Sequence, residues 1–342
     1  MNMNKNTPIG IVGYGLYIPK GRQSADEIAA ATNGVWTAEA VREKLGIEQK
    51  VIPGKKDGTQ DMGVWAAQDA LDRTGIDPMD IDLVLSIGEE WKEYPLTTSG
   101  IYIQEKIGAH KAWAIDVQQR CCSTISAIKM AKDMMLADEE IKTVLIAGGY
   151  RNGDFVDYTD KTMSMMFNLS AAGGALILQK GYERNQILGS HVMSDGSMAR
   201  DAGVVYGGTA NPITCANVDK AYKSLTLMQE AHMKERLNEV SMDNWMHCID
   251  QSLKKSGMTR KDIDYLAVLH FKRSMHHVML DLLGLKEDQS VYLNQFGHAG
   301  QIDQIISLHL GLEQGKIKDG SVISMIAAGI GYAWAANVIK WG

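Results

Sequence analysis

The fold is decided by the stretch Gly75-Ile-Asp-Pro-Met-Asp-Ile-Asp82 and its counterpart Gly257-Met-Thr-Arg-Lys-Asp-Ile-Asp264. In each, we expect a helix to end at the glycine, because glycine suits a left-handed C-cap, and a strand to follow the last aspartate. The strands read VLSIG and AVLHF, and the segments AIDVQQRCCS and YLNQFGHAG then open a further helix each. Four elements that recur in order after about 180 residues indicate an internal duplication.

The same alternation continues along the chain and predicts an α/β fold with a largely central sheet. Helices are expected near residues 63–74, 99–107 and from Cys121 onward. The expected strands are IGIVGYG, IDLVLSIG, WAIDV, KTVLIAGG and GGALILQ. The duplication predicts an N-terminal half over residues 1–180 and a C-terminal half over residues 181–342.

The segment Ser321 to Ile339 carries no charge over 19 residues, which is near the length that spans a bilayer. Gly329 and Gly331 interrupt it, and its flanks are small and β-branched. We therefore predict two buried strands around a glycine turn, and no membrane span.

Composition excludes several function classes. The chain has 342 residues, 45% of them hydrophobic, and a net charge of -6 from 41 acidic and 35 basic residues without long runs. Neither a nucleic-acid partner nor an anionic membrane surface is indicated. The four cysteines form no metal-binding or disulfide pattern, and the first residues lack a secretory signal. We expect a cytoplasmic protein without a metal site.

Duplication brings matching helix N-termini face to face. Cys121 is expected to open one of these helices and His298 the other. A helix N-terminus carries partial positive charge and unpaired N–H groups, which stabilise a thiolate. The alternative for Cys121 is a small apolar core residue.

A family resemblance favours the nucleophile. The segment Asp116-Val-Gln-Gln-Arg-Cys121 resembles the nucleophile motif of β-ketoacyl-acyl carrier protein synthase III and of hydroxymethylglutaryl-CoA synthase, where an aspartate precedes the catalytic cysteine by five residues. The resemblance implies the thiolase superfamily, with its duplicated five-layered α-β-α-β-α architecture. Further similar segments are Trp36 through LGIEQKVI, ILGSHVMSDGS, LAVLHFK, FGHAG and AAGIGYAW.

The resemblance also implies roles for other residues. His270 in AVLHFK holds the place of a histidine that binds the substrate carbonyl or moves a proton, the alternative being a structural histidine at a strand end. The turn Ala328–Gly331 resembles the one that completes an oxyanion hole, with the N–H groups of Cys121 and Ile330 as donors. The implied enzyme is an acyltransferase that takes a short acyl group from a coenzyme A thioester, without a tightly bound cofactor.

Two departures from synthase III affect the expected chemistry. His298 stands where that family has an asparagine, which argues against decarboxylative condensation and favours a non-decarboxylative Claisen-type step. Residues 87–94 resemble the segment of hydroxymethylglutaryl-CoA synthase that carries its catalytic glutamate, at Glu90. An aldol condensation that uses Glu90 is the alternative, unless Glu89, Glu90 and Glu93 form a solvated acidic loop.

Partners are implied only by resemblance. Trp36, Arg151, Lys272 and Arg273 are candidates to bind coenzyme A or an acyl carrier protein, the alternative for each charge being solvated surface. A homodimer is expected. A further alternative is a non-catalytic subunit of a larger acyltransferase complex, with a small zinc-binding partner.

Overall fold

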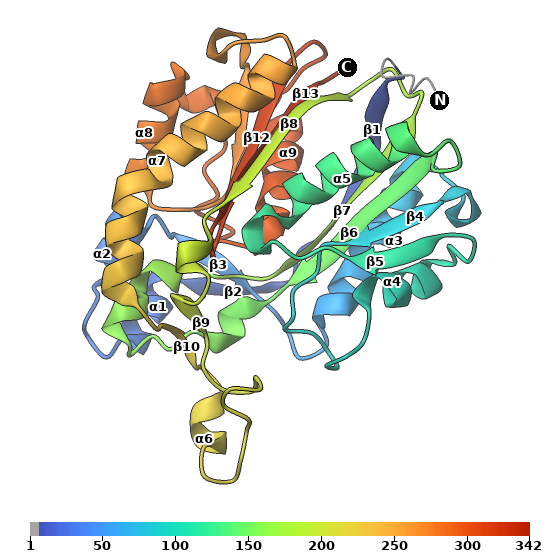
Figure 1. Ribbon diagram of the computed structural model, residues 1–342. Coiled ribbons are helices and arrows are strands. Elements are labelled where there is room, and N and C mark those ends of the chain that lie inside the picture. Colours follow the sequence, from blue (N-terminus) through green and yellow to red (C-terminus); the bar gives the residue numbers. More distant parts are fainter. Residues whose placement is uncertain (1–6) are drawn as a thin grey trace.

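The computed structural model describes residues 7–342, and a mixed sheet of nine strands runs through it (Figure 1). The order of the strands is β11-β12-β13-β8-β1-β7-β6-β4-β5. Their bounds are Ile9–Tyr17 for β1, Leu83–Ser86 for β4, Trp113–Asp116 for β5, Thr143–Tyr150 for β6, Ala172–Lys180 for β7, Gln186–Ser194 for β8, Tyr265–Val268 for β11, Val322–Gly329 for β12 and Ala333–Lys340 for β13.

The sheet consists of two halves with the same strand order, except that β5 has no counterpart strand in the second half. The first half has the order β5-β4-β6-β7-β1 and the second the order β11-β12-β13-β8, and they meet where Gly10 of β1 pairs with Gln186 of β8. In each half the first strand in the chain lies beside the last, and the last two strands are antiparallel neighbours. The chain passes from one half to the other between Lys180 and Gln186.

The two repeated stretches make equivalent hydrogen bonds. The Asp82 carboxylate accepts from the N–H of Thr143, where β6 begins, and the Asp264 carboxylate accepts from the N–H of Val322, where β12 begins. The Asp82 and Asp264 N–H groups bond to the carbonyls of the same two residues, both at 2.9 Å. Each aspartate thus fixes the register between a short strand and its parallel neighbour.

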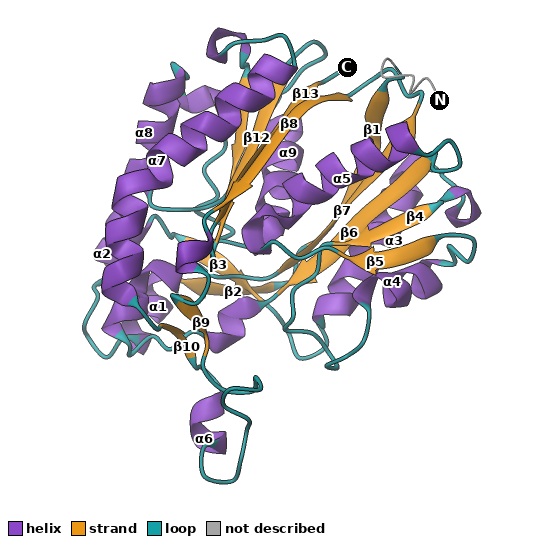
Figure 2. Ribbon diagram, viewed as in Figure 1, coloured by secondary structure: helices purple, strands orange, loops and turns teal. Residues whose placement is uncertain are grey.

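Helices complete a five-layered arrangement (Figure 2). The pair α5 and α9 lies between the two half-sheets, α3 and α4 cover one outer face, and α7 and α8 lie on the other. The predicted α/β fold of duplicated halves is confirmed. The helices are α1 (Ala25–Ala31), α2 (Ala38–Ala40), α3 (Thr59–Thr74), α4 (Ser99–Ile107), α5 (Ser123–Ala137), α6 (Val218–Ala221), α7 (Glu230–Lys255), α8 (Arg273–Leu283) and α9 (Asp303–Glu313).

Two small two-stranded sheets lie outside the main sheet. One pairs β2 (Gly21–Ser24) with β3 (Gln49–Ile52), and the other pairs β9 (Ala202–Val204) with β10 (Leu225–Leu227). The connection between β9 and β10 contains α6 and projects from the body as an arm (Figure 1).

The uncharged segment near the C-terminus forms the antiparallel strands β12 and β13, as predicted. Residues 330–332 make the turn between them. Within residues 7–342, no helix is both long and apolar enough to cross a membrane.

The helix expected over residues 63–74 begins four residues earlier, at Thr59. Its first turn is capped from a distant segment, because the Glu93 carboxylate accepts from the N–H groups of Gln60 and Asp61 at 2.9 and 3.1 Å. A carboxylate at a helix N-terminus also interacts favourably with the helix dipole.

We predict that Gly75→Ala and Gly257→Ala each lower the free energy of unfolding by about 1 kcal/mol. Both glycines have left-handed backbone (φ 68° and 69°), and a Cβ at either would meet no neighbouring atom. The cost therefore reflects backbone strain alone. Urea unfolding measures it, with Gly196→Ala as the matched control, because a Cβ there is equally free and φ is not left-handed. Equal stability of all three variants would contradict the assignment.

Candidate active site

Cys121 lies in the 3-10 turn Arg120–Cys122, which leads directly into α5. Arg120 has a φ of 52°, which is uncommon for a residue with a side chain. Ser123 stabilises this turn, since its Oγ accepts from the Gln119 N–H at 2.8 Å and donates to the Arg120 carbonyl at 2.7 Å. The thiol is thereby fixed at the start of the helix, and Cys121 as a whole is 8% exposed.

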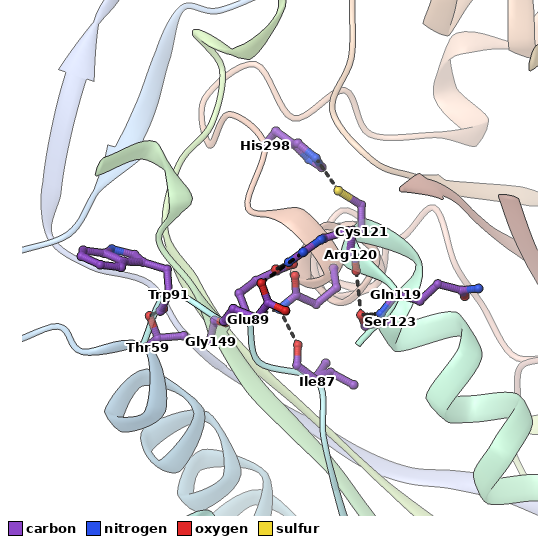
Figure 3. A network of polar contacts seen from close by, with 12 residues as sticks. Thr59, Ile87, Glu89, Trp91, Gln119, Arg120, Cys121, Ser123, Gly149 and His298 are labelled. Carbon is purple, nitrogen blue, oxygen red and sulfur yellow. Dashed lines mark hydrogen bonds and ion pairs between the residues drawn. The ribbon is translucent and has the colours of Figure 1, made fainter. Parts of the chain in front are cut away.

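His298 is the imidazole that contacts the thiol. Its Nε2 lies 3.1 Å from the Cys121 Sγ, and its Nδ1 lies 2.6 Å from Oδ2 of Asp303. Figure 3 shows the thiol and the imidazole pointing toward each other. Burial lowers the pKa of His298, but the neighbouring Cys121 and Asp303 outweigh burial and raise that pKa well above its usual range. Cys121, His298 and Asp303 thus form a hydrogen-bonded triad with the imidazole in the middle.

Asp303 is fully buried at the start of α9 and organises this part of the site. Besides the His298 ring, its carboxylate accepts from the N–H of Ala299 at 2.7 Å and from the N–H of His270 at 2.8 Å. The sequence analysis missed this residue. The available signal was its position five residues after His298, across the short turn that opens the helix.

His270 lies nearby, but both of its ring nitrogens are used by protein groups. Nε2 is 3.0 Å from the Gly46 carbonyl, and Nδ1 is 2.9 Å from the side-chain amide nitrogen of Asn168. A carbonyl only accepts and an NH₂ group only donates, so the ring proton resides on Nε2. Burial lowers the pKa of His270 to about 4, and the imidazole is neutral at neutral pH. Its predicted catalytic role stays a prediction.

The glycine turn after β12 packs against the nucleophile. A Cβ at Gly329 would lie 2.7 Å from the Gln119 carbonyl oxygen and 3.2 Å from the Cys121 nitrogen, so only glycine allows this approach. Ile330 follows directly. Its N–H as second oxyanion donor stays a prediction.

The three glutamates of residues 89–93 have different environments. Glu89 is 3% exposed and accepts from the Arg120 guanidinium at 2.9 Å (Figure 3). Burial raises the pKa of Glu89, against the effect of Arg120. The Glu90 side chain is 69% exposed and meets the same guanidinium at 3.2 Å, while Glu93 caps α3. Of the three glutamates, only Glu90 is solvated as the acidic-loop alternative expected. The buried carboxylate beside the turn that carries Cys121 is Glu89.

Asp116, five residues before Cys121, has a structural role. Its two carboxylate oxygens accept from the N–H groups of Ser99 and Gly100 at 3.0 and 2.7 Å and cap the start of α4. The motif aspartate thus positions a helix on the outer face of the sheet.

Two buried tyrosines stand beside the triad. The Tyr150 ring centroid lies 6.2 Å from that of His298. Burial, and then the nearby Cys121, raise the pKa of Tyr150 and of Tyr332. Both phenols are therefore neutral at neutral pH.

The four residues predicted to contact coenzyme A are in different local environments. Trp36 packs edge-on against Phe167, with ring centroids 6.5 Å apart. Arg151 is paired with Asp154 at 2.8 Å, Arg273 lies over the Tyr292 ring, and Lys272 is exposed. Their predicted contacts stay predictions. No group of metal-binding side chains is found within residues 7–342.

Comparisons with known proteins give the family. Residues 115–196 match the family model of 3-oxoacyl-[acyl-carrier-protein] synthase III, and residues 253–341 match the model of its C-terminal part. β-Ketoacyl-[acyl-carrier-protein] synthase III from Bartonella bacilliformis is 26% identical over 96% of this chain and 98% of its own length. The enzyme of that name from Syntrophomonas wolfei is 25% identical over 98% of both chains.

Solved structures show the same fold. 3-Oxoacyl-[acyl-carrier-protein] synthase III from Aquifex aeolicus superimposes with a TM-score of 0.82, at 18% identity, over 97% of this chain and 100% of its own. OleA from Xanthomonas campestris, solved with bound lauric acid and lauroyl-CoA, gives 0.81 at 14% identity over 98% and 99%. The chain therefore belongs to the 3-oxoacyl-[acyl-carrier-protein] synthase III family of the thiolase superfamily, a family of acyl-transferring condensing enzymes.

Proposed function

We propose that the protein forms an acyl-Cys121 intermediate from a short-chain acyl-CoA and transfers the acyl group to a carbon nucleophile without decarboxylation. The observation that carries this proposal is the triad of Cys121, His298 and Asp303. A thiol within hydrogen-bond distance of an imidazole that a carboxylate orients is the arrangement that activates a nucleophile.

In the first half-reaction, His298 takes the proton of the Cys121 thiol, and the thiolate attacks the thioester carbonyl. The N–H groups of Cys121 and Ile330 would stabilise the oxyanion, each contributing roughly 3 kcal/mol. The intermediate collapses as the bond to the coenzyme A sulfur breaks, and His298 returns its proton to that sulfur. Coenzyme A leaves as the thiol.

In the second half-reaction, His298 is neutral and can remove a proton from the carbon next to the carbonyl of an acceptor thioester. The resulting carbanion attacks the acyl-Cys121 carbonyl, a carbon–carbon bond forms, and the bond to the Cys121 sulfur breaks. We assign proton transfer to His298 because both nitrogens of His270 already bond to protein groups. A decarboxylating acceptor would need hydrogen-bond donors for its enolate, and the ring proton of His270 is already donated to the Gly46 carbonyl.

A second candidate function rests on Glu89. A buried carboxylate with a raised pKa is suited to proton abstraction, and Glu89 lies beside the turn that carries the nucleophile. In this alternative, Glu89 removes a proton from the methyl group of acetyl-Cys121, and the carbanion adds to a ketone in an aldol step. The exposed Glu90 is the weaker candidate.

We further propose that the acyl donor is a coenzyme A thioester or an acyl carrier protein and that the enzyme is a homodimer. The relatives' name includes the acyl carrier protein, and one structural neighbour holds lauroyl-CoA. No cofactor enters either half-reaction. The triad argues against a non-catalytic subunit with a zinc-binding partner.

We expect Cys121→Ser to abolish the acyl adduct, because a serine hydroxyl beside His298 is a far weaker nucleophile than a thiol. Intact-protein mass spectrometry after incubation with mixed short-chain acyl-CoAs measures the adduct. Cys215→Ser, in the exposed arm, is the control and should acylate like the unmodified enzyme. An adduct that persists in the Cys121 variant would contradict the proposal.

Asp303→Asn should slow acylation by roughly 10²- to 10⁴-fold, since the variant cannot stabilise the imidazolium of His298. Intact-protein mass spectrometry of samples quenched at successive times gives the acylation rate, and thermal unfolding verifies that the variant is folded. Asp319→Asn removes a carboxylate from an exposed pair with Arg184 and should leave the rate unchanged. A normal rate in the folded Asp303 variant would exclude the triad.

Hydrogen exchange separates the two routes. On the aldol route, acetyl-Cys121 formed in D₂O gains deuterium in its methyl group, and Glu89→Gln abolishes this exchange while the adduct still forms. Glu90→Gln is the matched control, as both carboxylates pair with Arg120. If the adduct gains no deuterium in the unmodified enzyme, the aldol route is excluded and the Claisen-type step is retained.

A further inference from the structure

Lys50 in β3 is a buried cation without a carboxylate partner in the part of the chain that the structure describes. It is 1% exposed, and its ammonium donates to the Leu169 carbonyl at 2.7 Å. Its other contact is the face of the Tyr158 ring, with the centroid 5.2 Å from Nζ. Buried charges in proteins are normally paired. Among the described residues, this ammonium has no counter-ion.

A cavity of about 390 Å³ adjoins Lys50, and both groups that Nζ contacts belong to its lining. The apolar lining residues are Val51, Ile52 and Pro53, together with the Tyr158 ring. The remaining lining residues are Arg22, Gln23, Glu27, Gly153, Asp154, Leu169 and Ser170.

A second polar group in this lining has no partner. Ser170 is 1% exposed, and its Oγ makes no hydrogen bond to the described residues. A buried hydroxyl without a partner costs free energy, as does the unpaired ammonium. A ligand that carries negative charge and acceptor oxygens would satisfy both groups.

We propose that this cavity binds the carboxylate of a small organic acid with an apolar body, which supplies the counter-ion for Lys50 and the acceptor for Ser170. Charge and shape favour this class of ligand. The acidic residues Glu27 and Asp154 are among the lining residues and disfavour a dianion such as phosphate, whereas the apolar lining residues suit a short hydrocarbon or aromatic group.

The site is separate from the thiol but shares a segment with it. His298 donates its N–H to the Asn168 carbonyl at 2.7 Å, and the Ser170 N–H donates to the His298 carbonyl at 2.9 Å. Lys50 bonds to the carbonyl of Leu169, in the middle of the same segment. The bound acid would therefore lie against the segment that holds the catalytic histidine in place.

Binding should depend on pH. Burial lowers the pKa of Lys50 to about 7, against a smaller opposite effect of Asp154. The other charged or titratable groups that line the cavity are Arg22, Glu27, Asp154 and Tyr158, so Lys50 is the single amine among them. A carboxylate binds the protonated amine, so affinity should be highest below pH 7 and should fall as pH rises above it.

Isothermal titration calorimetry of the full chain with acetate, butyrate, benzoate and inorganic phosphate, at pH 6 and pH 8.5, tests the proposal. We expect butyrate or benzoate to bind more tightly than acetate, phosphate to bind most weakly, and all binding to weaken at pH 8.5. Lys50→Met should weaken carboxylate binding at least about tenfold, and Ser170→Ala about threefold to tenfold.

Lys55→Met is the control, because it removes the same charge from an exposed position in the loop after β3. If Lys50→Met does not fold, carboxylate binding by Ser170→Ala still tests the proposal. The proposal is overturned if no carboxylate binds, if phosphate binds most tightly, or if binding by the Ser170 variant and any folded Lys50 variant equals that of the Lys55 variant.

Discussion

The active site depends on the buried carboxylate of Asp303. It accepts hydrogen bonds from the His298 ring and from the N–H groups of Ala299 and His270, and so holds two segments of the second half in one geometry. A carboxylate with no solvent contact is tolerated because three donors and a helix N-terminus compensate for the lost hydration. The two imidazoles have different partners in this geometry: one contacts the Cys121 thiol, and the other bonds to the Gly46 carbonyl.

Duplication supplies the constraint that brings the cysteine to this carboxylate. The turns before α5 and α9 pack together, and Thr124 at one helix start donates to the carbonyl of Gln301 at the other. The Gln301 side-chain amide in turn reaches the carbonyl of Ile87 in the first half. Hydrogen bonds between the two halves thus hold the starts of α5 and α9 together. The distance between the thiol and the imidazole therefore does not depend on a flexible loop.

The sequence predicts those parts of the structure that depend on interactions between residues close together in the chain or on the internal repeat. The left-handed glycines, the alternation of strands and helices, and the meeting of Cys121 with His298 follow from short stretches or from the repeat. Contacts between distant segments were not predictable in this way. Glu93 caps a helix more than thirty residues away, and the buried carboxylate is Glu89 instead of the neighbouring Glu90, because adjacent residues in a loop differ in burial only once the fold is formed.

The triad also suggests how one imidazole can serve both half-reactions. Burial lowers the pKa of His298, and the charges of a Cys121 thiolate and of the Asp303 carboxylate together raise it. In the proposed mechanism, acylation removes the thiolate charge, because the thioester sulfur is neutral. The pKa of His298 must then fall, while the bond from Asp303 keeps the ring in position. The histidine would thus keep the proton taken from the thiol while the thiolate attacks, and it would act as a base toward carbon only after the acyl group is in place. An asparagine at this position could donate a hydrogen bond in both states but could not change from acid to base.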